Sequence, residues 1–252
     1  SLLNTNHLAG TIPSAFTNVT SFSVSAKFQM ATNLPGNGQE NIWSMSSSST
    51  NFSGIGSRTP YSVNFGQYFD NAQQRDMLYI RFTGATISDY RDYFTWINEY
   101  RGKHIETVVT RDTNGTVSLY VEGLLRTLSQ NNVGSPAATT QAVYAPYFGV
   151  GKFDIHSRSN WLYGLSYAPG TNWTYDNIAK GQNWVAPQSN VVVLWDFEDA
   201  SMNGVWDKSG NGVNGYFTTT TPVTFGPRYH VPLITGSGVT RTGPNTFTVT
   251  SL

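Results

Sequence analysis

Apolar and polar residues alternate along most of the chain, as they do in β-strands that bury one face. In the segment 21–28, every second residue is apolar and the residues between are Ser or Lys. Similar patterns predict further strands at 41–45, 61–65, 77–82, 104–111, 116–121, 142–150, 161–167, 191–197 and 246–250. Many short strands at this spacing predict a β-sandwich or a β-barrel.

Residues that favour turns separate the predicted strands, as at 35–38, 114–115, 122–123, 169–170 and 210–212. Gly, Asn and Pro prevail there because they adopt the backbone conformations of tight turns. One short helix is predicted over residues 174–183, with Thr174 as its N-cap. No linker divides the chain, so we expect one domain over residues 1–234. Residues 235–252 are expected to form a C-terminal extension or an added edge strand.

Composition and charge exclude several classes of function. The 252 residues carry 15 Lys or Arg and 15 Asp or Glu, so the formal net charge is zero. Without a positive field, binding to nucleic acid through its phosphates is not expected. The chain has no cysteine, which excludes a disulfide framework and a thiolate nucleophile. No run of about 18 apolar residues occurs, so no membrane span is expected.

The segment 104–123 carries the most specific pattern in the chain. Two alternating stretches flank Asn114-Gly115, a dipeptide that suits a type I′ turn because both central residues need positive φ. A second turn at Glu122-Gly123 leads into a predicted strand at 124–128. This order of a His-containing strand, a Gly turn and a Tyr-Val-acid-Gly turn resembles the laminin G-like family of concanavalin-like sandwiches. That family more often has Asp where Glu122 stands.

Two further parts of the chain extend this resemblance. Residues 147–151 and 161–167 resemble the closing strands of the family, and residues 194–198 with the turn at 207–212 resemble its tryptophan strand and Asp-x-Ser-Gly-Asn turn. In many members that last piece opens the domain, whereas here it comes near the end. Either the C-terminal strands fill the place of N-terminal ones, or a sheet edge is left for another chain.

The resemblance covers residues 21–217 and implies an all-β fold. The expected architecture is a concanavalin-like (laminin G-like) antiparallel β-sandwich with a jelly-roll arrangement. This scaffold carries lectins, hydrolases and inert spacers alike, so the function has to be sought in particular side chains.

Catalysis is the least favoured function. Glycoside hydrolysis needs two carboxyl groups about 5 to 9 Å apart, and enzymes on this scaffold often carry them as Glu-x-Asp-x-x-Glu, which is absent here. Asp196 and Glu198 would share one strand face, but they alternate with Trp195 and Phe197, which favours an acidic face in solvent. No Gly-x-Ser-x-Gly motif accompanies the four histidines. We therefore expect no enzyme activity.

Two Asp-containing turns begin as a calcium loop does. In 199–204 and 207–212, the first, third and fifth positions carry Asp, Ser and Asn, and the sixth carries Gly. Neither turn has Glu at the twelfth position, and the same residues are common in ordinary turns. Many laminin G-like domains bind calcium, so the resemblance implies calcium as a cofactor. Its expected ligands are Asp199, Asn203, Asp207 and Asn211.

Aromatic and charged residues concentrate in the segment 89–101 more than anywhere else in the chain. Sugar recognition uses aromatic faces together with hydrogen-bonding side chains. The candidate ligand-binding residues are Tyr90, Tyr93, Trp96, Tyr100 and Arg101. The alternative is a sheet strand with Tyr93, Thr95 and Ile97 on one face and Phe94, Trp96 and Asn98 on the other. Its rings could equally form a protein interface.

The sequence thus predicts a non-catalytic binding module that recognises a glycan and serves in adhesion. The expected partners are a glycan or neighbouring copies of the chain in a homo-oligomer or assembly. The alternative is a structural subunit or decoration protein of a virion, tail fibre or extracellular filament, favoured by low charge and by a sheet edge that another chain completes. Both functions place the protein outside the cell or on a virion or cell surface.

Overall fold

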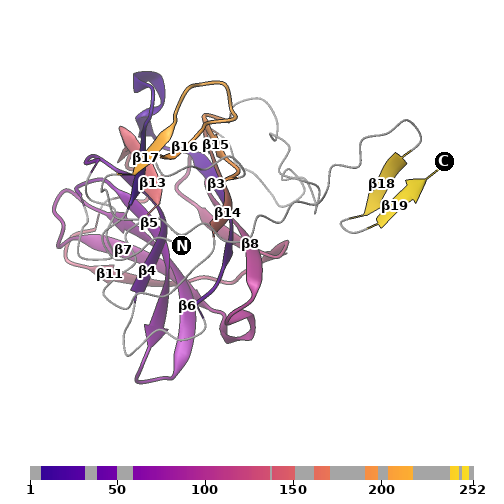
Figure 1. The fold of residues 1–252 in the computed structure, drawn as a ribbon. Coiled ribbons are helices and arrows are strands. Elements are labelled where there is room, and N and C mark those ends of the chain that lie inside the picture. The colour runs from indigo at the N-terminus through magenta and orange to yellow at the C-terminus, as the bar shows by residue number, and fades with distance from the viewer. Residues whose placement is uncertain are drawn as a thin grey trace.

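Two antiparallel β-sheets face each other as a sandwich and appear as two layers of arrows in Figure 1. The computed structural model describes residues 7–31, 39–49, 59–136, 138–150, 162–170, 191–197, 204–217, 239–243 and 246–249. Two short 3-10 helices, η1 (Ser14–Phe16) and η3 (Asn98–Tyr100), lie between strands.

The two large sheets have nine and six strands. Across the first sheet the order is β11 (Ser129–Val133), β7 (Tyr90–Trp96), β6 (Arg75–Thr83), β5 (Val63–Asp70), β4 (Gln39–Ser46), β13 (Tyr147–Val150), β1 (Leu8–Thr11), β17 (Gly215–Phe217) and β16 (Gly204–Val205). Across the second it is β10 (Leu124–Leu125), β9 (Val117–Val121), β8 (His104–Arg111), β3 (Phe22–Gln29), β14 (Leu162–Pro169) and β15 (Val193–Trp195). Two further pairs are β2 (Asn18–Val19) with β12 (Val143–Tyr144), and β18 (Val239–Gly243) with β19 (Thr246–Val249).

This arrangement confirms the predicted fold class. The chain passes repeatedly from one sheet to the other, as from β3 to β4 and from β7 to β8, which gives the concanavalin-like, jelly-roll architecture. The predicted strand at 104–111 has the bounds of β8. The alternation does not reveal β11, because its sequence Ser-Gln-Asn-Asn-Val is polar on both faces. The helix predicted at 174–183 lies outside the described residues.

The prediction for the end of segment 191–197 is wrong. Strand β15 ends at Trp195, and Phe197 has φ of 59°, a conformation that no strand residue adopts. The paired residues of β15 and β14 run from Val193 opposite Tyr167 to Trp195 opposite Leu165. Asp196 therefore does not continue a strand that would align it with Glu198, which lies outside the described residues.

The type I′ turn lies at Glu122-Gly123 and not at Asn114-Gly115. The φ angles of Glu122 and Gly123 are 50° and 82°, both positive as this turn requires, whereas in the other dipeptide only the glycine has positive φ. The hairpin that contains Asn114-Gly115 closes instead through a wider loop, in which the Asp112 N–H donates to the Thr116 carbonyl at 3.0 Å. The Asp112 carboxylate also accepts the Thr116 N–H at 2.8 Å, so a local acceptor decides the turn type.

Aromatic rings fill the space between the two sheets. Trp43 stacks on Phe65 and on Phe148, with ring centroids 5.5 and 6.3 Å apart. Phe148 in turn stacks on Tyr167 at 5.5 Å. Because these residues come from β4, β5, β13 and β14, one continuous core ties both sheets together.

Late strands of the chain complete both sheets. β15 extends the second sheet beside β14, and β17 pairs with β1 at the opposite end of the sequence. The buried indole of Trp195 fits against Gly10 and Gly215, where a Cβ atom would stand 2.9 Å from the ring. The C-terminal strands therefore fill places within this sandwich. The hairpin β18–β19 forms its own two-stranded sheet and lies apart from the sandwich in Figure 1.

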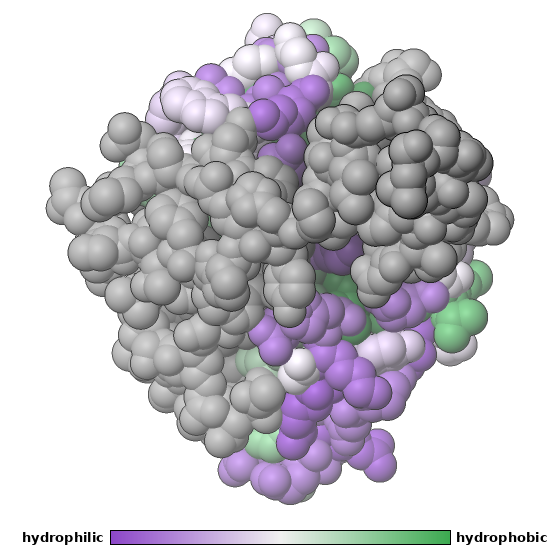
Figure 2. Space-filling view, turned by 45° about the vertical axis from the view of Figure 1, so that its right-hand side comes forward, coloured by the Kyte–Doolittle hydropathy of each residue, from purple (hydrophilic) through white to green (hydrophobic). Residues whose placement is uncertain are grey.

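The outer face of β3 is buried as well as its inner face. Ser23 and Ser25 are as inaccessible as Val24 and Ala26 beside them, so the expectation of a single buried face is wrong for this strand. The described surface visible in Figure 2 is mostly hydrophilic, with small separate hydrophobic areas. Among the described residues, no helix is long and apolar enough to cross a membrane.

Candidate ligand-binding groove

A groove of about 600 Å³ opens between the edges of the two sheets. One wall comes from β7 and β11 through Tyr93 and Gln130, and the other from the β8–β9 loop and the segment after β10. This volume lies within the range of about 300 to 1,000 Å³ typical of sites for small ligands. The groove is lined by Tyr93, Asn114, Gly115, Thr116, Val117, Ser118, Leu125, Arg126, Thr127, Leu128, Gln130 and Thr139.

The ring of Tyr93 is the aromatic surface of this groove, and the core holds it in place. Tyr93 points to the inner face of the first sheet and packs edge-on against Phe82, with ring centroids 5.9 Å apart. Phe82 rests in turn on the buried ring of Phe22 at 6.3 Å. A ring fixed in this way presents apolar area to a ligand without losing much conformational freedom.

Polar side chains surround the ring. The guanidinium of Arg126 donates to the Trp96 carbonyl at 3.1 Å and to Glu99 at 2.8 Å, so its orientation is fixed. The Gln130 side chain donates through Nε2 to Oδ1 of Asn132 at 3.0 Å. The groove therefore offers both donors and acceptors beside an aromatic face.

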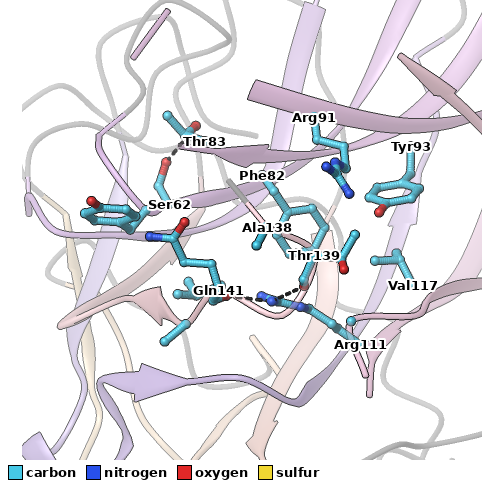
Figure 3. Close-up of a pocket in the computed structure, with 14 residues that line it drawn as sticks. Ser62, Phe82, Thr83, Arg91, Tyr93, Arg111, Val117, Ala138, Thr139 and Gln141 are labelled. Carbon is cyan, nitrogen blue, oxygen red and sulfur yellow. Dashed lines mark hydrogen bonds between the residues drawn. The ribbon is translucent and has the colours of Figure 1, made fainter. Parts of the chain in front are cut away.

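A deeper pocket adjoins the groove and shares four of its lining residues, Tyr93, Gly115, Val117 and Thr139. Its free volume is about 20 Å³, which is room for about one water molecule. At its base, Nη2 of Arg111 donates to the carbonyls of Thr139 and Gln141, the latter at 2.6 Å (Figure 3). Gly115 is needed here, because a Cβ atom would stand 2.5 Å from the Thr139 carbonyl.

The five residues predicted to bind a ligand do not gather in one place. β7 alternates as a strand does, so Tyr93 faces inward to the groove while Tyr90 and Trp96 face outward. The Tyr90 ring lies under the guanidinium of Arg81, with 3.8 Å from Cζ to the ring centroid. Trp96 packs edge-on against Phe94 at 6.0 Å. This is the two-faced strand that the sequence offered as the alternative.

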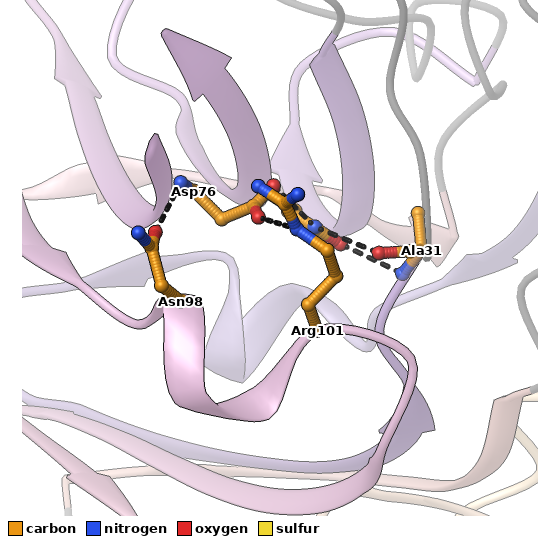
Figure 4. A network of polar contacts seen from close by, with 5 residues as sticks. Ala31, Asp76, Asn98 and Arg101 are labelled. Atoms are coloured by element: carbon orange, nitrogen blue, oxygen red, sulfur yellow. Dashed lines mark hydrogen bonds and ion pairs between the residues drawn. The ribbon is translucent and has the colours of Figure 1, made fainter. Parts of the chain in front are cut away.

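Tyr100 and Arg101 follow β7 at the base of the sandwich. Tyr100 belongs to η3 and packs against the core. Arg101 donates through Nε to the buried carboxylate of Asp76, which also accepts a hydrogen bond from Gln67 at 3.2 Å (Figure 4). Gln67 itself accepts the Ala31 N–H at 3.0 Å. This network ties β5, β6 and the end of β3 together, so Arg101 is engaged in structure.

The turn predicted to bind calcium uses its carboxylate to hold the backbone. One oxygen of Asp207 accepts the N–H groups of Leu194 at 2.9 Å and Ser209 at 3.0 Å. The other accepts the Ser209 hydroxyl at 2.7 Å and the Val213 N–H at 3.1 Å. With two donors on each oxygen, this carboxylate does not fit a calcium ligand.

Of the remaining predicted metal ligands, only Asn211 belongs to the described residues. The amide of Asn211 donates to the Val191 carbonyl at 2.9 Å, and Asp199 and Asn203 lie outside the described residues. Where the structure is described, it holds no group of three or more His, Asp or Glu side chains that could share a metal ion.

Most groove residues carry no signal in the sequence. The walls come from residues 93, 114–118, 125–130 and 139, which belong to four separate segments. Of these, only Tyr93 stands out, through the aromatic content of its neighbours. The others are Asn, Gly, Thr, Val, Ser, Leu, Arg and Gln residues, and only the packing of two sheets brings them to one edge.

The chain was also compared with known proteins. No protein-family model and no curated protein matches it, so the laminin G-like resemblance stays a prediction. Among solved structures it is similar to a heptameric SAP-like pentraxin from Limulus polyphemus, at 14% identity and a TM-score of 0.48, over 78% of this chain and 90% of that one.

Two other similar structures come from larger proteins. Tailspike protein 2 of bacteriophage CBA120, in its enzymatically active domain, is 8% identical with a TM-score of 0.46, over 73% of this chain and 27% of that one. The binding domain of botulinum neurotoxin serotype G is 11% identical with a TM-score of 0.44, over 64% of this chain and 36% of that one. This chain thus spans about a quarter of the tailspike chain and about a third of the neurotoxin chain. No residue role is transferred from these proteins.

Proposed function

We propose that the protein is a non-catalytic module that binds a glycan in the groove beside Tyr93. The observation that carries this proposal is the combination of a sugar-sized groove, a ring fixed by the core and oriented polar side chains around it. Pyranose rings present an apolar face to aromatic residues and hydroxyl groups to amides, hydroxyls and guanidinium groups. The walls of the groove carry an aromatic ring, amides, hydroxyls and a guanidinium group.

The chemistry of the lining supports binding over catalysis. None of the described residues that line the groove is Asp or Glu, so it lacks the pair of carboxyl groups that glycoside hydrolysis ordinarily requires. A glycan-binding module of this kind would act on an exterior surface, of a cell or of a virion. Its role there would be adhesion.

The test is a glycan array with the full chain and matched variants on the two faces of β7. We expect Tyr93→Leu and Gln130→Ala to lose binding, because both line the groove, and Trp96→Leu to retain it, because Trp96 faces outward. Circular dichroism and melting temperature would establish that each variant is folded. Loss of binding in Trp96→Leu alone would move the site to the outer face, and a blank array for the folded wild type would refute glycan binding.

A second function, as a subunit of a larger assembly, is favoured by two unpaired strand edges. β11 is an exposed polar strand at the edge of the first sheet, paired on one side with β7. The hairpin β18–β19 pairs only with itself among the described strands, and a lone hairpin is marginally stable. Such edges can accept a strand of another chain.

Light scattering would test the assembly function. If the chain associates through its C-terminal hairpin, removal of residues 235–252 should reduce the particle mass to that of a monomer. An intact chain that is already monomeric at high concentration would count against this function and leave glycan binding as the remaining proposal.

A further inference from the structure

Two arginine side chains converge on the deep pocket from opposite sheets. Arg91 comes from β7 in the first sheet, and Arg111 comes from the end of β8 in the second. Figure 3 shows both side chains around the pocket with Tyr93 beside them. Arg111 is 1% exposed, and its guanidinium lies over the Phe82 ring at 5.1 Å from the centroid.

Neither guanidinium has a carboxylate partner among the described residues, in contrast to Arg81, Arg101 and Arg126. No Asp or Glu lines the pocket where the structure is described. Nε of Arg91 and Nε of Arg111 are both buried and make no hydrogen bond with a described residue. Two residues that line the same small space therefore each carry a buried cationic donor without a hydrogen-bond partner among the described residues.

This arrangement is unfavourable for the protein alone. A buried charge destabilises the folded protein unless it is paired, and two like charges in one pocket add to the destabilisation. Burial lowers the pKa of Arg111 and the positive charge of Arg91 adds to the lowering, while Tyr93 and Asp112 oppose it without restoring the ordinary value. An anion of suitable size would supply the missing partner for both groups.

We propose that the pocket and the groove form one site for an acidic sugar, whose carboxylate binds between Arg91 and Arg111 while its ring lies against Tyr93. This inference rests on the proposed glycan-binding function. The shared lining residues, Tyr93, Gly115, Val117 and Thr139, make the two spaces continuous. The small volume of the pocket suits a planar carboxylate oxygen, and guanidinium groups bind carboxylates through paired, directed hydrogen bonds.

The experiment uses matched pairs of sugars with the full chain. The array carries sialyllactose beside lactose, an oligogalacturonate beside its carboxyl-reduced form, and sulfated lactose. We expect binding to carboxylated members at least about tenfold tighter than to their neutral partners. The preference should shrink as salt rises, because it depends on charge.

Variants then test the two arginines. Arg91→Gln should abolish the preference for the carboxylated member, with a far larger loss of affinity for that member than for its neutral partner. Arg75→Gln removes the same charge from an exposed position outside the site and should change neither affinity. Since Arg111 also anchors the backbone at Thr139 and Gln141, Arg111→Lys serves as its variant and should lower the preference while the protein stays folded.

The outcomes separate the inference from the function beneath it. Binding of neutral sugars with no acidic preference, or a preference that survives both Arg91→Gln and Arg111→Lys, would overturn the acidic-sugar inference and leave glycan binding standing. Binding of sulfated lactose alone would replace the carboxylate by a sulfate and overturn the inference as stated. Binding of no glycan at all would refute the proposed function itself.

Discussion

Two buried arginines in this sandwich have opposite surroundings. Arg81 lies on the outer face of the first sheet, where Nε and Nη2 both donate to the Asp92 carboxylate and the side chains are 7% and 12% exposed. Arg111 lies at the groove, where its hydrogen bonds go to two backbone carbonyls, and the charges that act on it are those of Arg91 and of Asp112, which forms no ion pair with it among the described residues. Both groups are shielded from water, but only Arg81 is neutralised.

The surroundings shift the two pKa values in opposite directions. Burial acts to lower the pKa of Arg81, but the hydrogen bond and the negative charge of Asp92 outweigh it and hold the pKa above its ordinary value. Burial lowers the pKa of Arg111, and no carboxylate bonded to it restores the balance. A charge that is paired within the protein stabilises the folded state, whereas a charge without a carboxylate partner beside a groove can bind a ligand.

Breaking the paired site should have the largest effect. Arg81→Met leaves the Asp92 carboxylate buried without a partner, which should lower the free energy of unfolding by about 3 to 5 kcal/mol. Urea denaturation of wild type and variant measures this loss. The double variant Arg81→Met/Asp92→Leu should recover most of it, because both charges are then gone. A double variant no more stable than the single one would show that packing, not charge, makes this site.

Removing the unpaired charge should cost less. Arg111→Met keeps most of the side-chain volume, loses the hydrogen bonds to Thr139 and Gln141, and relieves the burial of a charge. The lost hydrogen bonds destabilise the protein, whereas removal of a buried charge stabilises it. We therefore expect the free energy of unfolding, measured by urea denaturation, to fall by about 1 to 2 kcal/mol. A loss as large as that of Arg81→Met would mean that Arg111 has a negative partner and would contradict the comparison.

The sequence predicts the two sides of this comparison unequally. Alternation predicts β7 as a two-faced strand, and with it that Tyr93 and Trp96 point in opposite directions. The same period is visible in β3, β6 and β8, because their buried faces require it. The β-sandwich could therefore be predicted from the alternation of apolar and polar residues and from the turn residues.

The candidate site could not be predicted from the sequence in this way. Arg91 and Arg111 are twenty positions apart on strands of different sheets, and nothing in the chain says that their side chains converge. The predicted ligand set instead followed local composition, and the strand pleat divided it between two faces. A local concentration of aromatic residues indicates a strand, whereas a ligand-binding site depends on which strands meet at a sheet edge.

A partly buried carboxylate, that of Glu106, extends the comparison to negative charge. Burial raises the pKa of Glu106, the nearby Lys27 opposes this, and Glu122 adds to it. An acid with a raised folded-state pKa holds its proton more strongly when folded. Stability from this group is therefore gained as pH falls from neutral through the raised pKa, and is lost as pH rises through it.

The variant Glu106→Gln should isolate this contribution. We expect it to raise the free energy of unfolding at neutral pH by less than about 1 kcal/mol, because the group is still partly solvated. The gain should vanish well below the ordinary pKa of 4.5, where Glu106 is protonated in both states. Denaturation curves across this pH range provide the measurement. A gain that persists in acid would assign it to packing instead.

The smallest expected effect is that of removing calcium. Asp207 is a charged group that the fold has fully engaged, since each of its oxygens accepts two hydrogen bonds from the protein. A cation bound only to the native state would raise the melting temperature by mass action. We expect no change in melting temperature between millimolar calcium and a chelator, and the same value in magnesium. A rise specific to calcium would contradict this expectation and show that Asp207 gives up protein donors to the ion. A charge that is paired within this fold could then exchange its protein partners for an ion. Only ligand binding would then distinguish Arg111 from Arg81.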